Sequence, residues 1–180
     1  CAKAALFPMY FWLPQTYTHA PAAVAALFAI MTKVGLYAVL RVGTLSFGLA
    51  GPLAGFAWPA LLALGATTLV LSSLGVLASR KLRAMTAYLV LGSAATLFLA
   101  FALSTTGTIA AGLYYLVHST FAGAALFLLA DLIRRRRGSA GDRKDLVAAL
   151  PGRMIPGVLF LVTAVSLAGL PPLSGFIGKL

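Results

Sequence analysis

The sequence predicts an all-α membrane protein, built as a bundle of transmembrane helices. Hydrophobic residues make up 61% of the chain and charged residues only 9%, and the mean hydropathy is +1.00. Such a composition lies far outside the range of soluble globular domains. The apolar residues form runs close to the ~20 residues that a helix needs to cross a hydrocarbon core of about 30 Å.

Six such runs are expected to be the spans of a single transmembrane domain that covers residues 1–180. They lie at about 2–14, 21–42, 58–79, 85–104, 108–133 and 154–180. Prolines interrupt the first run, and the segment from Gly169 to Gly175, with its proline pair, interrupts the last. Both runs are therefore expected to be discontinuous helices. Residues 43–57 are rich in Gly and Pro, too irregular to span, and are expected to form a surface connection.

The positive charge predicts the orientation of these spans. The net charge is +11, and ten of the fourteen Lys and Arg residues gather in two polar connections and their flanks. These ten are Arg80, Lys81, Arg83, Arg134, Arg135, Arg136, Arg137, Arg143, Lys144 and Arg153. Because Lys and Arg concentrate in cytoplasmic loops, the pattern places connections 80–84 and 134–153 in the cytoplasm. It explains the charge better than a nucleic-acid surface does, with contact to anionic lipid headgroups as a secondary role.

Four cations remain within the spans or at their ends: Lys3, Lys33, Arg41 and Lys179. Lysine is costly at bilayer depth, so the three lysines are candidates for a functional site. Lys3 could instead lie near a helix end, and Lys179 could be a flank that follows a span. Lys33 is harder to explain in that way, because it lies about 16 Å along a helix that starts after Pro21, near the middle of the membrane.

His118 lies near the middle of the span at 108–133 and has tyrosine, serine and threonine neighbours. It could be a core histidine bonded to a hydroxyl, but an imidazole is also the side chain best suited to relay protons near neutral pH. Burial disfavours the charged form of a lysine, and a neighbouring charge of opposite sign reverses that effect. Lysines bridged by water and His118 could therefore pass protons, which predicts ion translocation.

Catalytic chemistry has little support in the sequence. The three carboxylates, Asp131, Asp142 and Asp145, lie at the polar end of a span or in the adjoining loop, so no acid/base pair is expected inside the membrane. Cys1 is the single cysteine, and no Cys/His cluster has the spacing of a metal site. Neither a metal nor a cofactor is expected, because no P-loop or dinucleotide motif occurs in a suitable context.

Several segments resemble a known family of membrane subunits. The segments that carry the resemblance are Lys3 with Leu6–Pro14, Leu27–Arg41, Arg80–Tyr88, Leu113–Asp131 and Gly169–Lys179. They resemble the membrane subunits shared by respiratory NADH:quinone oxidoreductase and the Mrp/Pha-type multisubunit monovalent cation/proton antiporters, most of all the D-type subunits of these antiporters. The resemblance covers the whole chain, which we expect to be an internal piece of a longer protein.

The resemblance implies a role for each interior residue. In that family, protons pass along lysines on two broken helices that belong to inverted repeats. Lys3 would be the lysine of the first broken helix, partnered by a glutamate upstream, and Lys33 the connecting lysine. His118 would be the relay histidine and Lys179 the lysine at the outlet on the second broken helix. Ser93 lies near a position where some respiratory relatives carry another histidine, which favours the antiporter group.

The resemblance thus implies a proton-translocating subunit of a Na+ or K+/H+ antiporter in the bacterial inner membrane, a transporter and not an enzyme. Its partners would be the other subunits, the lipid bilayer, protons and Na+ or K+, without nucleic acid. The alternative is a proton-pumping subunit of NADH:quinone oxidoreductase that holds no redox cofactor itself. A purely structural bundle would leave the interior lysines unexplained.

Overall fold

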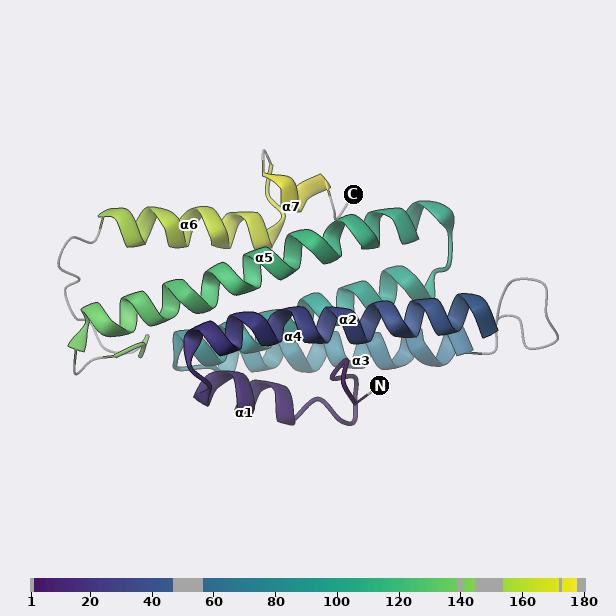
Figure 1. Ribbon diagram of the computed structural model, residues 1–180, viewed down its shortest axis with the longest axis horizontal. Helices are drawn as coiled ribbons and strands as arrows, with labels where there is room; N and C mark the ends of the chain where they lie inside the picture. Colours follow the sequence, from purple (N-terminus) through teal and green to yellow (C-terminus); the bar gives the residue numbers. More distant parts are fainter. Residues whose placement is uncertain (1, 47–56, 139–140, 145–153, 172, 178–180) are drawn as a thin grey trace.

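The computed structural model describes residues 2–46, 57–138, 141–144, 154–171 and 173–177 (Figure 1). Within these ranges the helices are α1 (Trp12–His19), α2 (Ala22–Ser46), α3 (Ala57–Ala78), α4 (Leu82–Ala102), α5 (Thr106–Arg136), α6 (Met154–Ala168) and α7 (Ser174–Ile177). One isolated β-bridge joins Lys81 and Arg143, and no described residue belongs to a strand. The expected connection at 43–57 lies mostly outside the described residues.

The all-α membrane class predicted from the composition is confirmed. Four helices among the described residues are long and apolar enough to cross a bilayer: Ala22–Leu45, Trp58–Ala78, Leu82–Ala102 and Thr106–Arg136. α6 is equally apolar but has only 15 residues. The chain is therefore a multi-pass membrane protein by the length and composition of its helices.

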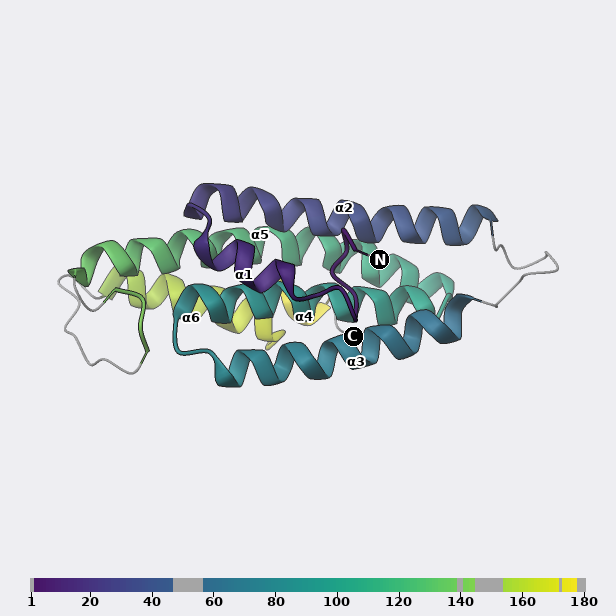
Figure 2. The same cartoon turned by 90° about the horizontal axis from the view of Figure 1, so that it is seen from below.

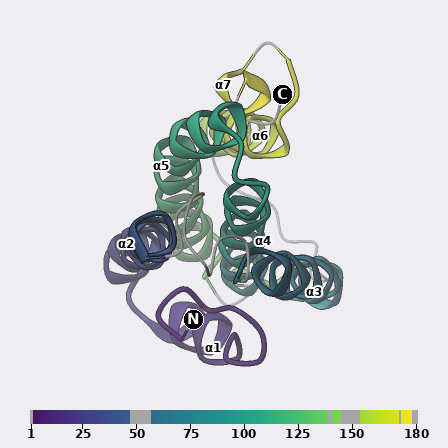
Figure 3. The same cartoon turned by 90° about the vertical axis from the view of Figure 1, so that its right-hand side faces the viewer.

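The long helices run side by side, with α4 and α5 at the centre. In the end-on view of Figure 3, α4 lies between α3 and α5, and α2 packs on the other side of α5. α1 lies below α2 and α4 and covers only part of their length, as Figure 2 also shows. α6 and α7 pack on the outer side of α5. This arrangement brings residues from α2, α4, α5 and α6 towards a shared interior.

Local signals explain where α5 begins and ends. Thr105 precedes it and forms a capping box with Thr108, since each side chain oxygen accepts a hydrogen bond from the backbone N–H of the other residue at 3.2 Å. At the other end, Arg134, Arg135 and Arg136 place positive charge beside the carbonyl end of the helix, which the helix dipole favours. α5 is therefore a single uninterrupted helix of 31 residues that carries His118 near its middle.

The first expected span differs from the structure. Residues 2–11 consist mostly of turns, and the helix begins at Trp12 and ends at His19, where the sequence suggested a connection. Pro14 is the third residue of α1, in the first turn, where the missing N–H of a proline leaves no intrahelical bond unmade. A helix that ended at Pro14 would have lost such a bond, so the proline marks a helix start and not a break within one.

The basic connections meet at one end of the bundle. The α1–α2 turn, the α3–α4 turn and the end of α5 all lie at the left end of Figure 1. The backbone of residues 141–144 pairs there with the start of α4, since Leu82 N donates to Asp142 O at 2.9 Å and Lys144 N donates to Arg80 O at 2.8 Å. The two connections that the charge pattern assigns to one side of the membrane are thus in direct contact.

Candidate functional site

Lys33 lies in the protein interior, in the middle of α2. Its side chain is 1% exposed, and its Nζ donates a hydrogen bond to Ser93 Oγ on α4 at 2.5 Å. Ser93 Oγ in turn donates to Val90 O at 2.7 Å, so its lone pair is free to accept from the lysine. A buried charge is expensive unless it is paired. The carboxylate of Asp131 pairs with Arg134 and Arg135 at the far end of α5 and not with Lys33. Lys33 is the one lysine of the described chain that the fold places fully inside.

Lys3 is exposed, but its backbone packs closely against α2. A Cβ placed on Gly35 would lie 3.3 Å from Ala4 N and 3.4 Å from Lys3 Cγ, a tight contact that a larger residue would relieve only by a small shift of these neighbours. Phe7 N also donates to Thr68 Oγ1 of α3 at 3.0 Å. The first residues are therefore fixed on the bundle against α2 at Gly35, two residues along the helix from Lys33.

His118 is half-buried at the point where α5 meets α6 and α7. Its Nε2 lies 3.2 Å from Ser166 O near the end of α6, and its Nδ1 lies 3.1 Å from Ser174 Oγ at the start of α7. The ring of Tyr115, one turn earlier on α5, lies 6.2 Å from the imidazole between centroids. Lys179 lies outside the described residues.

A polar cavity of about 170 Å³ lies between the Lys33 and His118 neighbourhoods. Ser93, the partner of Lys33, lines it on one side, and Tyr115, the neighbour of His118, lines it on another. The remaining lining residues come from α3, α4 and α6 and include hydroxyl groups: Leu69, Ser72, Ser73, Val76, Tyr88, Leu89, Gly92, Thr96 and Leu167. Hydroxyl groups and apolar side chains both line this space, which is large enough for several water molecules. The sequence singled out Lys33 and His118, but not the serines and tyrosines that lie between them.

A second, mostly apolar groove of about 540 Å³ runs between α2 and α5. Lys33, Val34 and Tyr37 line it from α2, and Val117 and Thr120 are among its residues on α5. Lys33 therefore contacts two different spaces, a polar one through Ser93 and an apolar one along the outer face.

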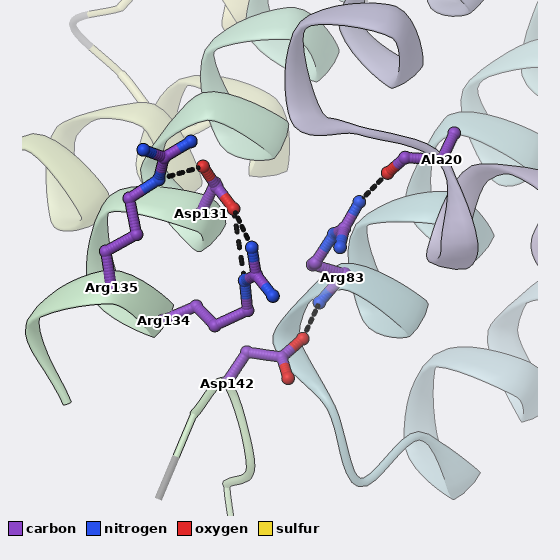
Figure 4. A network of polar contacts seen from close by, with 6 residues as sticks. All are labelled: Ala20, Arg83, Asp131, Arg134, Arg135 and Asp142. Carbon is purple, nitrogen blue, oxygen red and sulfur yellow. Dashed lines mark hydrogen bonds and ion pairs between the residues drawn. The ribbon is translucent and has the colours of Figure 1, made fainter. Parts of the chain in front are cut away.

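The polar end of the bundle holds the remaining charges in a network that Figure 4 shows. Arg83 is buried, and its guanidinium donates to Ala20 O while its backbone N–H donates to Asp142 Oδ2 at 3.2 Å. Asp131 pairs with Arg134 and Arg135 at 2.9 and 2.7 Å. His19 and Lys81 line a cavity of about 210 Å³ beside this network. These groups join three connections to one another and lie far from the Lys33 interior, which suits a structural role.

No metal site is formed in the part of the chain that the structure describes. No three His, Cys, Asp or Glu residues there come close enough together to hold a metal ion. The polar interior instead offers an ammonium group, an imidazole and hydroxyl groups, all of which can donate or accept protons. These groups lie among helices that are long and apolar enough to cross a membrane, which defines the class as a multi-pass membrane protein.

The comparisons with known proteins agree with this class. Residues 1–180 match the family described as "NADH:quinone oxidoreductase/Mrp antiporter, TM", and the chain belongs to this family. It is 40% identical to the D subunit of a "Probable K(+)/H(+) antiporter" of Rhizobium meliloti (strain 1021), over 98% of this chain and 36% of that protein. It is 38% identical to the D subunit of the "Na(+)/H(+) antiporter" of Bacillus subtilis (strain 168), over 98% of this chain and 35% of that protein.

A solved structure shows the same fold. A chain in the structure of the Mrp complex from Dietzia sp. DQ12-45-1b superposes with a TM-score of 0.84 at 29% identity, covering 99% of this chain and 33% of that one. The resemblance to the antiporter group that the sequence motifs carried is therefore confirmed. The present chain spans about a third of the length of these relatives.

Proposed function

We propose that the chain is the proton-translocating part of a membrane subunit in a multisubunit antiporter that exchanges Na+ or K+ for protons. The observation that carries this proposal is the Lys33 ammonium, buried in the protein and bonded to Ser93 at the edge of a polar cavity. A lysine in that position gains and loses its proton according to nearby charge, because burial disfavours its charged form. The names of the two curated relatives described above, both antiporter D subunits, support the same function.

The path begins at Lys3, runs through Lys33 and His118 and leaves through Lys179. Lys3 packs against α2 at Gly35, two residues along the helix from Lys33, and its exposed side chain would take up the proton at the start of the path. From Lys33 the proton passes to Ser93, then through water in the cavity to Tyr115 and His118. Hydroxyl groups and water can carry a proton across the cavity, because each accepts one hydrogen bond while it donates another.

Two discontinuous helices, one from each of two inverted repeats, support this path. The first would consist of α1 and the non-helical residues 2–11 that precede it, and the second of α6 and α7, between which Gly169 adopts a φ of +78°. Irregular backbone at membrane depth is tolerated only where protein or a water-filled cavity covers it. Each interruption therefore places polar backbone next to the proposed path, as in other transporters with broken helices.

The subunit lies in the bacterial inner membrane, where residues 1–180 form part of one antiporter-like domain with six spans. Connections 80–84 and 134–153 face the cytoplasm, which is supported by their contact at one end of the bundle and by their basic residues. The other antiporter subunits and the lipid bilayer are its partners.

The alternative function is proton pumping as a subunit of respiratory NADH:quinone oxidoreductase, because the family includes both assemblies. Ser93 argues against it, since it bonds Lys33 where some respiratory relatives have another histidine. The two functions differ in what drives transport: an antiporter needs a gradient of Na+ or K+, whereas a respiratory pump needs NADH oxidation. The genes beside this one would separate them as well.

The proposal is tested by fluorescence-monitored proton transport in everted membrane vesicles that contain the full complex. Addition of Na+ or K+ should release protons from vesicles with the wild-type protein, without NADH. Lys33→Ala should abolish this exchange, as should Lys3→Ala and Lys179→Ala. Lys33→Arg keeps a charge that proteins do not deprotonate, so it should be as inactive as Lys33→Ala.

Arg136→Ala is the matched control, because Arg136 is an exposed cation at the polar end of the bundle. It should leave exchange unchanged at wild-type levels of assembly. Normal exchange in all three lysine variants would overturn the proposed path, and transport that requires NADH in place of a cation would favour the respiratory alternative.

A further inference from the structure

His118 contacts both sides of the junction between α6 and α7. Its Nε2 faces the Ser166 carbonyl, 3.2 Å away in the last turn of α6, and its Nδ1 faces the Ser174 hydroxyl, 3.1 Å away in the first turn of α7. Between these two serines, α6 ends at Ala168 and Gly169 takes a positive φ of +78°. A single ring on α5 thus bridges a turn that backbone hydrogen bonds also hold, among them Gly169 N to Val165 O at 3.1 Å.

The two contacts determine which ring nitrogen carries the proton. A carbonyl oxygen can only accept a hydrogen bond, so Nε2 must be the N–H that donates to Ser166 O. In the neutral imidazole Nδ1 is then an acceptor, and the Ser174 hydroxyl must donate to it. When the ring takes a second proton, Nδ1 becomes a donor, and the Ser174 hydroxyl has to turn round and accept.

Gly175 allows the start of α7 to pack directly against the Ser166 carbonyl and the His118 ring. A Cβ on Gly175 would overlap the Ser166 carbonyl oxygen and lie 2.9 Å from His118 Nε2. The backbone of α7 therefore contacts the Ser166 carbonyl, which accepts the hydrogen bond from the imidazole. A change in the Ser174 bond cannot be absorbed by empty space at this point, because Gly175 is buried.

Few other ionisable groups face this imidazole from the helices packed on α5. The described residues of α6 and α7 carry none. α2 contributes Lys33 and Tyr37 along its groove with α5, and α4 contributes Tyr88 at the polar cavity. Tyr115 lies on α5 itself. A second proton on His118 would therefore meet no described carboxylate, and the Ser174 hydroxyl is the nearest group that can respond.

We propose that Ser174 is a positioning residue for His118, and that a second proton on His118 reverses their hydrogen bond and thereby shifts the α6–α7 junction. This proposal rests on the proposed function, in which His118 relays protons. It adds a conformational consequence: protonation of His118 changes the conformation of the turn between α6 and α7. Three groups transmit this change: the Ser174 hydroxyl, the Gly175 backbone and the Ser166 carbonyl.

The test uses the full-length protein in lipid bilayers with two spectroscopic readouts. The 15N signals of the His118 imidazole, assigned by their loss in His118→Gln, report its protonation. A 19F label on Leu170→Cys, in a background in which Cys1 and any other cysteine of the full-length protein are replaced by Ser, reports the junction; Leu170 is exposed and lies in the turn after α6. Wild type, Ser174→Ala, Ser174→Thr and Thr163→Ala are compared over the same range of pH. Thr163 is the matched control, because its hydroxyl bonds only to Leu159 O of its own helix.

In the wild type, the Nε2–H form should be the neutral tautomer, and the 19F signal should change over the same pH range as the imidazole. Ser174→Ala should lose most of the 19F change while the imidazole still titrates, whereas Ser174→Thr and Thr163→Ala should keep it. A full 19F change in Ser174→Ala or in His118→Gln, or an Nδ1–H tautomer in the wild type, would overturn the proposal. Because neither readout measures transport, a wild-type protein whose 19F signal does not follow the imidazole but whose cation/proton exchange is normal would overturn this proposal and leave the proposed function standing.

Discussion

Lys33 and Ser93 are the pair on which the proton path depends. The ammonium is buried on α2, and its hydrogen bond to Ser93 on α4 spans the centre of the bundle. No carboxylate among the described residues pairs with it, because Asp131 and Asp142 are engaged at the polar end. The protonation state of a buried lysine that is bonded only to a hydroxyl is sensitive to any charge that comes near it, because no described carboxylate offsets the cost of burying the ammonium.

Ser93→Ala is predicted to slow cation/proton exchange by about tenfold or more. A hydrogen bond to a charged group contributes roughly 1.5–3 kcal/mol, and about 1.4 kcal/mol corresponds to a factor of ten. Ser93→Thr keeps the hydroxyl and should retain most of the rate. The measurement is the initial rate of fluorescence change in everted vesicles at equal protein content.

Thr67→Ala is the control for this prediction, because the Thr67 hydroxyl is exposed and bonds only to Ala63 O and Leu64 O of its own helix. It should exchange at the wild-type rate. A Ser93→Ala protein as fast as the Thr67→Ala protein would show that the Lys33 contact is not used in transport.

The sequence indicated Lys33 but not its partner. A lysine in the middle of an apolar run is conspicuous, because the membrane makes it costly. A serine in such a run is not, since its hydroxyl is normally satisfied by its own helix, as the bond from Ser93 to Val90 O illustrates. Only the packing of α2 against α4 shows that the same oxygen also accepts from Lys33.

At the scale of elements, close contact between the first residues and α2 depends on Gly35. Gly35→Val should lower the free energy of unfolding by about 1–3 kcal/mol, because the added carbons would press on the backbone at Lys3 and Ala4. Thermal unfolding in nanodiscs measures the change. Gly157→Val is the control, since nothing lies within 4 Å of a Cβ at that position of α6. Equal effects of the two substitutions would contradict the close packing of residues 3 and 4.

Asp142 caps α4 from a distant part of the sequence. Its carbonyl oxygen accepts from Leu82 N, and its carboxylate accepts from Arg83 N, so it satisfies two of the free N–H groups at the start of this helix. Asp142→Ala should therefore cost about 1 kcal/mol, whereas Asp142→Asn, which keeps an acceptor, should cost less. Thermal unfolding of both variants tests this prediction, and an Asn variant as unstable as the Ala variant would contradict it.

The boundaries of the long helices could largely be predicted from apolar runs, but α1 could not. The run at 85–104 corresponds to α4 at Leu82–Ala102, and the run at 108–133 to α5 at Thr106–Arg136. Where prolines divide an apolar run, the run alone does not predict which of its residues are helical. Residues 2–11 contact α2 and α3 through packing that has no local signature, and the helix follows Pro8 and contains Pro14 in its first turn.

For the whole molecule, the meeting of the basic connections predicts a single orientation in the membrane. Residues at the polar end, such as Arg136, should face the cytoplasm, and residues between α4 and α5, such as Thr105, the opposite side. Cysteines introduced at these two positions, in a background in which Cys1 and any other cysteine of the full-length protein are replaced by Ser, are labelled with an impermeant thiol reagent. Arg136→Cys should react only in everted vesicles and Thr105→Cys only in intact cells. The reverse pattern would overturn the assigned orientation.

The most direct test of the central claim is a high-resolution density map of the whole assembly in lipid. The account predicts the Lys33 ammonium in the protein interior, bonded to Ser93, with ordered water in the cavity between Ser93 and Tyr115 and continuing towards His118. A map that places Lys33 against lipid, or that fills this cavity with side chains from the rest of the protein and leaves no water, would contradict it.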